Sequence, residues 1–204
     1  MKEQTPTKVY TPSPRGGIGK GVKYIGVDDL DIDLFESQYR VPEGMSYNSY
    51  VILDEKVAVL DTADQRKSVE WQKRMLDTLE GREIDYLIVH HMEPDHAANI
   101  AGVAEAYPGM KIVLSAAAAK MLPNFFPEAN LQGRLLIVKE GDTLSLGQHT
   151  LQFIAAPMVH WPEVLMSYEQ TEKMLFAADG FGKFGALEHE QWNADGTLAD
   201  WACE

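Results

Sequence analysis

The segment from His90 to His96 constrains the fold of this chain more than any other stretch of its sequence. It reads His-His-Met-Glu-Pro-Asp-His, and four of its side chains can each donate a nitrogen or a carboxylate oxygen to a metal ion: His91, Glu93, Asp95 and His96. Imidazole nitrogens and carboxylate oxygens are suitable ligands for first-row transition metals. The sequence therefore predicts a metal site, and the fold must bring these donors together.

An apolar run precedes this segment and a helical pattern follows it. Residues 85–89 are typical of a buried strand, and residues 97–107 carry apolar side chains at helical spacing before Pro108 and Gly109. In layered α/β folds, functional side chains collect beyond the ends of strands. The segment therefore lies where such a fold builds a site.

The backbone conformation of the segment decides which donors point together. In an extended run alternate side chains point the same way, so we expect His91, Glu93 and Asp95 on one side, with His96 turning in where the helix begins. The alternative is a polar loop in which Asp95 caps the helix and the histidines face solvent. We favour the metal site because so many donors follow directly after an apolar strand.

Two later residues can complete the site. His160 follows an expected strand at residues 150–155, and Asp179 follows another at residues 174–177. A lone histidine or aspartate at a strand end is usually a hydrogen-bonded loop residue. These two residues gain weight because they fall where the first cluster needs partners.

Three other residues each have a functional and a plain interpretation, and a fourth has a plain one. His90 can orient a carboxylate of the site, or it can be a solvated or satisfied core histidine. Trp161 can wall the site or simply pack, and Asp61 can bond a ligand histidine or form a turn. His189, which lies between two glutamates, is most simply a solvated loop residue.

Strands alternate with helices along the chain, which predicts an α/β fold. A hairpin near the start makes its sheets mixed. We expect strands at residues 23–27, 47–53, 57–60, 85–89, 111–114, 134–138, 150–155, 164–168 and 174–177, and helices at residues 65–80, 97–107 and 116–122. We expect a flexible arm over residues 1–21 and one domain over residues 22–204, with loop-like structure after Asp179.

The composition argues against several classes of function. The chain has 204 residues and a net charge of −13, from 31 acidic and 18 basic residues. An acidic surface repels phosphate backbones and anionic membranes, so we expect no nucleic-acid or membrane binding. The single cysteine, Cys203, excludes an intrachain disulfide, and no apolar run of signal-peptide or membrane-spanning length occurs. We therefore expect a cytoplasmic protein.

Together these residues resemble the metal motif of the metallo-β-lactamase superfamily. The motif is His91-x-Glu93-x-Asp95-His96, followed by His160 and Asp179. Most hydrolytic members carry His where Glu93 stands, and a Glu there resembles the flavodiiron proteins, cytoplasmic enzymes that reduce oxygen or nitric oxide. Four flanking stretches are similar to the same family: Tyr47-Asn48-Ser49-Tyr50, Leu60-Asp61-Thr62, His160-Trp161-Pro162 and Ala178-Asp179-Gly180-Phe181-Gly182. The resemblance runs from about Val22 to Glu204.

The resemblance implies an αββα sandwich of mixed sheets flanked by helices, with two iron ions. Six side chains would bind them: His91, Glu93 and His160 one ion, Asp95 and His96 the other, and Asp179 both. This oxygen-rich donor set suits iron or manganese. Zinc is a further possibility in a purified sample, but it would leave the site inert for redox chemistry.

The sequence departs from the family pattern in two places. The pattern includes a seventh ligand, a histidine well downstream of Asp179, and His189 is too close to serve. The flavodoxin-like domain, which holds the FMN that feeds electrons to the irons, is also absent from these residues. We therefore expect a domain that is incomplete at its C-terminus and leaves apolar surface uncovered. Such a domain would be marginally stable or covered by a partner chain.

Three functions are compatible with these observations. The first is a diiron oxidoreductase domain that reduces O2 to water or NO to nitrous oxide, in a homodimer, with electrons supplied through FMN by rubredoxin or a flavin reductase. The second is a stand-alone diiron oxygen-binding sensor module, which the missing FMN domain favours. The third is a zinc-dependent hydrolase, in which zinc-bound water attacks an ester or amide carbonyl. Glu93 argues against the third.

Overall fold

The structure is a computed structural model that describes residues 18–187, and the statements below concern these residues. Most of the expected N-terminal arm, together with His189 and Cys203, lies outside the described residues. The chain divides into two compact units. The larger unit contains residues 18–27 and Tyr47–Gly180, and the smaller contains residues 28–46 and 181–187.

The larger unit is built on two β-sheets. The first has the strand order β1-β6-β7-β8-β9-β10, and these strands are Val22–Tyr24, Tyr50–Leu53, Val57–Leu60, Tyr86–Ile88, Lys111–Ser115 and Leu135–Val138. In this sheet β1, β6 and β7 pair antiparallel, whereas β7 to β10 pair parallel. The second sheet is antiparallel, and its strands β11 to β14 are Thr143–Ser145, Thr150–Ala155, Leu165–Glu169 and Met174–Phe176. The predicted α/β class with mixed sheets is confirmed.

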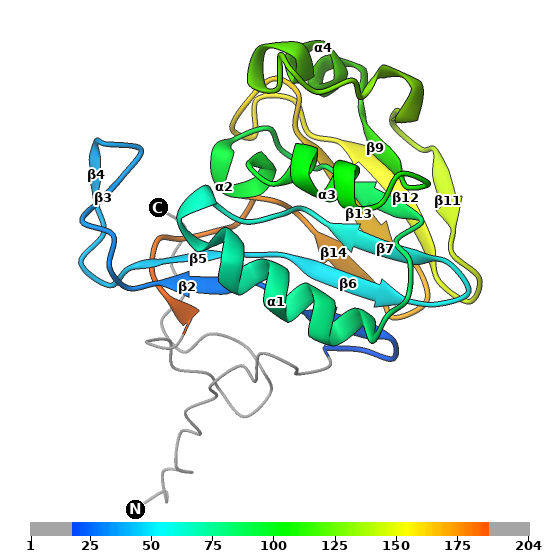
Figure 1. Cartoon of the computed structure of the whole chain (residues 1–204), viewed down its shortest axis with the longest axis horizontal. Coiled ribbons are helices and arrows are strands. Elements are labelled where there is room, and N and C mark those ends of the chain that lie inside the picture. Colours follow the sequence, from blue (N-terminus) through cyan, green and yellow to red (C-terminus); the bar gives the residue numbers. More distant parts are fainter. Residues whose placement is uncertain (1–17, 188–204) are drawn as a thin grey trace, which may run out of the picture. The chain divides into compact units, whose positions relative to one another are not determined.

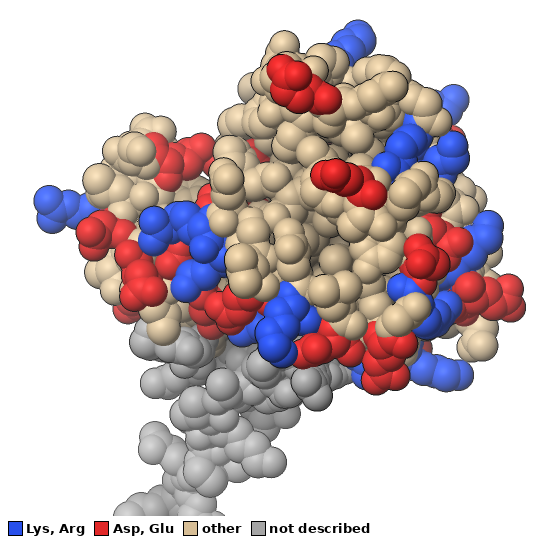
Figure 2. All heavy atoms as spheres, in the orientation of Figure 1, with Lys and Arg blue, Asp and Glu red and all other residues tan. Residues whose placement is uncertain are grey.

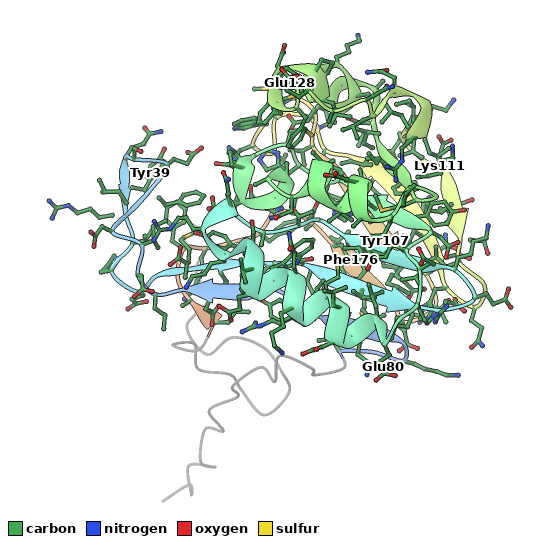
Figure 3. All side chains as sticks on the ribbon, viewed as in Figure 1. Tyr39, Glu80, Tyr107, Lys111, Glu128 and Phe176 are labelled. Atoms are coloured by element: carbon green, nitrogen blue, oxygen red, sulfur yellow. The ribbon has the colours of Figure 1, made fainter. Side chains whose placement is uncertain are left out.

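The two sheets face each other across one hydrophobic core. Along β12 buried and partly exposed residues alternate, and its buried Leu151 and Phe153 join a cluster that includes Ile88 from the first sheet. Phe176 from β14, labelled in Figure 3, meets Tyr50 edge-on with ring centroids 5.0 Å apart. Burying one such side chain stabilises the fold by about 1.5–3 kcal/mol. This core therefore holds the two sheets together beneath the site.

Helices cover the six-stranded sheet. The four α-helices of the described residues are α1 (Ser68–Leu79), α2 (Pro94–Ala97), α3 (Ile100–Ala106) and α4 (Ala116–Phe125). Figure 1 shows α1 and α3 across the front of this sheet, with the second sheet behind it. Helix α1 buries Trp71, Met75 and Leu79, which recur every fourth residue and so form one face.

Three strand predictions need correction. The predicted strand at residues 23–27 is two strands, β1 and then β2 (Val27–Asp29), because the chain leaves the six-stranded sheet between them. Strand β11 was not predicted, because its Thr-Leu-Ser sequence is too short and polar to show a period. The predicted strand at residues 47–53 is also divided, because β5 (Met45–Tyr47) ends and β6 begins only at Tyr50, in another sheet. The hairpin of β6 and β7 and the remaining predicted strands are confirmed with small shifts at their ends.

Two helix predictions also need correction. The helix expected at residues 97–107 begins earlier, at Pro94, and is broken into α2 and α3 around Asn99, whose side chain donates to the carbonyl of Ala63 at 2.6 Å. The helix expected to end before Pro123 continues to Phe125. Proline in the last turns of a helix removes a single hydrogen bond, and the helix absorbs that loss.

Two short sheets that the sequence pattern does not reveal have most of their residues in the smaller unit. Strand β2 pairs with β5 (Met45–Tyr47), and β3 (Leu34–Phe35) pairs with β4 (Tyr39–Arg40). The ring of Phe184 packs against Phe35 and Tyr39, with centroids 5.8 and 5.6 Å apart. Strands of two or three residues are too short for a detectable alternation.

No helix within residues 18–187 is both long and apolar enough to cross a membrane. Figure 2 shows acidic and basic side chains interspersed over the visible face. On that face, the described residues therefore present no continuous basic surface for a nucleic-acid backbone.

Candidate metal centre

The ends of four strands position the predicted site residues within the larger unit. Asp61 follows β7, while His90 and His91 follow β8, and these parallel strands end at the same edge of their sheet. In the second sheet His160 follows β12 and Asp179 follows β14. These two strands run in the same direction because each is antiparallel to β13. The site therefore forms where the carboxyl ends of strands from both sheets come together.

The chain turns from strand to helix inside the ligand segment. Glu93 is extended, with φ −61° and ψ 144°, and it occupies the N-cap position before Pro94, the first residue of α2. Proline suits this position because N–H groups in the first turn of a helix have no partner within the helix, so the N–H that proline lacks costs no hydrogen bond. Asp95 and His96 are helical, so the prediction that His91, Glu93 and Asp95 share one side of an extended run is wrong. The alternative with Asp95 as the cap is also wrong.

The first group of donors contains four side chains: His91, Glu93, His160 and Asp179. His91 Nε2 lies 3.1 Å from Glu93 Oε2 and 3.3 Å from His160 Nε2. His160 Nε2 lies 2.9 Å from the same Glu93 oxygen and 3.2 Å from Asp179 Oδ2. Two nitrogens and two oxygens therefore converge on one point.

The second group of donors contains three side chains: Asp95, His96 and Asp179. His96 Nε2 lies 2.8 Å from Asp179 Oδ1 and 3.7 Å from Asp95 Oδ2. Asp179 belongs to both groups, with Oδ2 toward the first and Oδ1 toward the second. The two groups are therefore adjacent and joined through one carboxylate.

The donor separations fit first-row metal ions. Atoms bound about 2.0–2.2 Å from one ion lie roughly 2.8–3.6 Å from each other, and the contacts of the first group fall between 2.9 and 3.3 Å. In the second group, the buried Oδ1 of Asp95 has no hydrogen-bond partner among the described residues. Buried polar atoms normally have a partner, and a cation there would provide one.

The buried charges of the site shift the pKa values of its members. Burial raises the pKa of the Asp95 carboxyl to about 6, against the opposing effect of His96 and with the support of Asp179 and Glu93. Burial acts to lower the pKa of His96, but Asp95 and Asp179 outweigh it and hold that pKa well above its ordinary value. An acid and a base with strongly shifted pKa values in one place are characteristic of functional sites.

Glu163 is a buried site residue that the sequence pattern does not reveal. Its Oε1 lies 2.7 Å from Nδ1 of His91 and accepts a hydrogen bond from the backbone N–H of Met92 at 2.9 Å. In the sequence it stands three residues after His160, directly before the apolar run that forms β13. That position is a weak signal, because nothing in it specifies a contact with His91.

His90 lies behind the site and contacts residues of both sheets. Its Nδ1 lies 2.8 Å from Oδ2 of Asp61, and its Nε2 lies 2.5 Å from Oγ of Ser167. The same Asp61 oxygen lies 3.4 Å from Nδ1 of His96, but this nitrogen has no hydrogen-bond partner among the described residues. The hydrogen bond that Asp61 makes to a histidine ring is therefore to His90 and not to a donor histidine. A cavity of about 50 Å³ borders Asp61, His90 and His96, with Tyr50 on its wall. Its volume is enough for water molecules.

The site is open to solvent on one side. The side chains of His91 and Glu93 are buried, whereas that of His160 is 52% exposed and that of Asp179 is 35% exposed. Trp161 meets the ring of His91 edge-on, with centroids 5.1 Å apart, so it forms a wall of the site as well as packing. A small molecule would reach the donors from the side of His160 and Asp179.

Comparison with known proteins connects this geometry with a family. A family model described as "ODP family beta lactamase" matches residues 45–199, which contain all six predicted donors. The chain belongs to the ODP family. Among the proteins that this ODP-family chain matches are diflavin flavoproteins, flavorubredoxins and flavodiiron proteins of known structure, so the resemblance drawn from the motif and the lactamase-like fold are confirmed.

Three relatives illustrate the match. Diflavin flavoprotein A 1 of Synechocystis sp. is 36% identical over 172 residues, covering 81% of this chain and 28% of that protein. Anaerobic nitric oxide reductase flavorubredoxin of Salmonella typhi is 32% identical over 176 residues, covering 84% and 36%. The structure of rubredoxin oxygen:oxidoreductase from Desulfovibrio gigas matches with a TM-score of 0.79 and 32% identity, covering 84% and 42%. This chain therefore spans well under half the length of these relatives.

Proposed function

We propose that this chain is a diiron oxidoreductase domain that reduces O2 to water, NO to nitrous oxide, or both. Electrons would reach it through FMN bound by a separate flavodoxin-like domain. One observation carries the proposal: two adjacent donor groups share the carboxylate of Asp179. The resemblance supports it, because Glu93 stands where most hydrolytic members of the superfamily carry His.

We propose that the donor groups hold one iron ion each: His91, Glu93, His160 and Asp179 the first, and Asp95, His96 and Asp179 the second. When bound, the iron pair would supply the electron transfer to O2 or NO. The carboxylate-rich and thiolate-free donor set supports iron or manganese over softer metals. Trp161 shields one side of His91 from water, while the exposed edge at His160 admits the substrate.

The names of two relatives support a class of electron donor. One relative is a flavorubredoxin and the other a rubredoxin oxygen:oxidoreductase. We therefore propose a rubredoxin-type donor, with a flavin reductase as the alternative. A homodimer and a cytoplasmic location complete the proposal, and light scattering of the purified chain tests the first.

A single-turnover experiment tests the proposed reaction. The chain is loaded anaerobically with Fe(II), and stopped-flow absorbance follows its oxidation after mixing with O2 or NO. We expect rapid oxidation of the iron, with consumption of O2 in the first case and formation of nitrous oxide, measured by gas chromatography, in the second. Addition of reduced FMN should then support repeated turnover.

Two comparisons make the outcome decisive. The Asp179→Asn variant removes the shared negative charge and should abolish the reaction under the same loading conditions. A wild-type chain that binds zinc alone and hydrolyses an ester contradicts the proposal in favour of a hydrolase. A reversible oxygen-dependent absorption band without turnover contradicts it in favour of an oxygen-binding sensor.

A further inference from the structure

A buried carboxylate lies directly behind the imidazole of His91. The His91 side chain is fully buried, and its two ring nitrogens face in different directions: Nε2 toward Glu93 and His160, and Nδ1 toward Oε1 of Glu163 at 2.7 Å. Glu163 is not a member of either donor group. It therefore contacts the site only through the far side of a donor ring and the backbone beside it.

The structure holds Glu163 in place from several directions. Its Oε1 also accepts from the backbone N–H of Met92, and its carbonyl accepts from the hydroxyl of Ser115 at the end of β9. Two residues further on, the N–H of Leu165 donates to the carbonyl of His90 at 2.9 Å. These bonds tie the start of β13 to the chain that follows β8, so the carboxylate has a fixed place behind His91.

This contact determines which nitrogen of His91 is available to a cation. A carboxylate accepts but does not donate, so Nδ1 of the neutral ring carries the proton and points it at Glu163. The lone pair is then on Nε2, which faces Glu93 and His160. Histidines that bind metals commonly have such a partner on the other nitrogen, and it fixes both the tautomer and the ring orientation.

The burial of Glu163 gives the contact a second consequence. Its side chain is fully buried, and Oε2 has no hydrogen-bond partner among the described residues. A buried carboxylate with incomplete hydrogen bonding is costly. A cation on Nε2 makes the N–H at Nδ1 a stronger donor, so metal binding would offset part of that cost. The carboxylate is therefore better satisfied in the metal-bound protein.

We propose that Glu163 is a positioning residue for His91. Glu163 sets the tautomer of the His91 ring and raises the metal affinity of the first donor group without touching the metal. The inference rests on the proposed metal centre. It assigns to Glu163 an effect on one of the two ions, because the second group contains Asp95, His96 and Asp179 and not His91.

A matched pair of variants tests this assignment. Glu163→Gln keeps the size of the side chain and removes its charge. Glu169→Gln makes the same change at another fully buried glutamate, whose Oε1 lies 3.2 Å from Nδ1 of His149, a histidine outside both donor groups. Each full-length variant is titrated with Co²⁺ against a chelator, and the visible absorption of bound Co²⁺ gives a second readout. The Asp95→Asn variant identifies the titration step of the second group.

We expect Glu163→Gln to weaken the first-group ion by about 10–100-fold and to leave the second-group ion at its wild-type affinity. Glu169→Gln should leave both affinities unchanged, even though it lowers the melting temperature of the metal-free chain. Equal affinities in wild type and Glu163→Gln overturn the inference, and so does an equal loss at both ions. A wild-type chain that binds no Co²⁺ overturns the proposed metal centre itself, which is a distinct result.

A spectroscopic measurement on the wild-type chain covers the case in which Glu163→Gln does not fold. In ¹⁵N-edited NMR spectra, we expect a downfield proton resonance on Nδ1 of His91 that exchanges slowly with solvent and persists after metal addition. A proton on Nε2 of His91 in the metal-free chain, with none on Nδ1, overturns the inference. The Glu163→Asp variant, which withdraws the carboxylate by one methylene, should broaden this resonance.

Discussion

Asp179 is the residue whose two carboxylate oxygens face different donor groups, Oδ2 toward His160 and Oδ1 toward His96. Burial acts to raise its pKa, but the facing imidazoles of His96, His91 and His160 outweigh burial and hold it below the ordinary value. The carboxylate is therefore charged at neutral pH and is shared between the two groups. Asp95, in contrast, belongs to one group.

The two aspartates should therefore have different effects on metal binding. We expect Asp179→Asn to weaken both ions and Asp95→Asn to weaken one, because a neutral amide is a poorer ligand than a carboxylate. Calorimetric titration of each variant with Mn²⁺ gives the number of ions and their affinities. An Asp179→Asn protein that still binds two ions as tightly as wild type contradicts the shared role.

Residue type and local spacing predicted a cluster of candidate donors at His91, Glu93, Asp95 and His96, which are neighbours in the chain, and the structure brings these side chains together with His160 and Asp179. Residue type alone was not sufficient for the contacts behind them. Glu163 meets His91 across 72 residues, and Ser167 meets His90 across 77. Such pairs depend on how the two sheets pack, and neither a glutamate just before β13 nor a serine within it specifies a partner.

Glu169 gives a prediction for pH-dependent stability away from the site. Burial acts to raise its pKa, but hydrogen bonds from the backbone N–H groups of Glu172 and Thr171, with support from His149, hold it below the ordinary value of 4.5. The carboxylate of Glu169 therefore binds a proton more readily in the unfolded chain than in the folded one. The stability that the ionised Glu169 gives to the fold is present above about pH 4.5 and is lost as the pH falls further. Urea denaturation between about pH 6 and pH 3.5 should show a shallower fall for Glu169→Gln than for wild type. Parallel curves would count against the argument.

At the scale of elements, the turn from β8 into α2 decides the division of the donors. Periodicity predicted a strand followed by a helix, and both exist. It did not predict that the helix begins inside the ligand segment. The helix starts there with an extended Glu93 at the N-cap and Pro94 at the first helical position, and neither residue adds to the apolar pattern. As a result, Glu93 remains with His91, and Asp95 joins His96 in the second group.

Ser115 tests the link between two other elements. It ends β9 and caps α4, where its Oγ accepts from the N–H of Ala118 at 3.1 Å and donates to the carbonyl of Glu163 at 2.9 Å. We expect Ser115→Ala to lower the free energy of unfolding by about 1–2 kcal/mol, because it removes an N-cap. Ser145→Ala, at an exposed position of β11, should change it by less than about 0.5 kcal/mol. Equal effects in chemical denaturation would contradict the capping role.

At the scale of the whole molecule, one edge strand of each large sheet carries exposed apolar side chains. Ile137 on β10 is 45% exposed, and so is Leu175 on β14. Within residues 18–187 each of these strands has one paired neighbour in its sheet. Edge strands with apolar side chains favour association with another chain. These two strands are where the expected uncovered surface would lie, and both that surface and a partner that covers it stay predictions.

Association of the purified chain is measurable directly. We expect light scattering to show a mass that rises with concentration, and Ile137→Lys to reduce that rise, because a charge on an edge strand opposes pairing. The variant places its charge on an exposed side chain, so the melting temperature should change little. A mass that stays at 22.8 kDa over the whole concentration range contradicts this expectation.

The iron content of the intact chain tests the central claim most directly. The chain is loaded anaerobically with Fe(II), freed of excess metal by gel filtration, and measured by plasma emission spectroscopy against the protein concentration. We predict two iron ions per chain, one for each donor group, and fewer than two in the Asp179→Asn variant under the same conditions. A wild-type chain that retains no iron, or retains as much as its Asp179→Asn variant, contradicts the claim that these side chains form a diiron site.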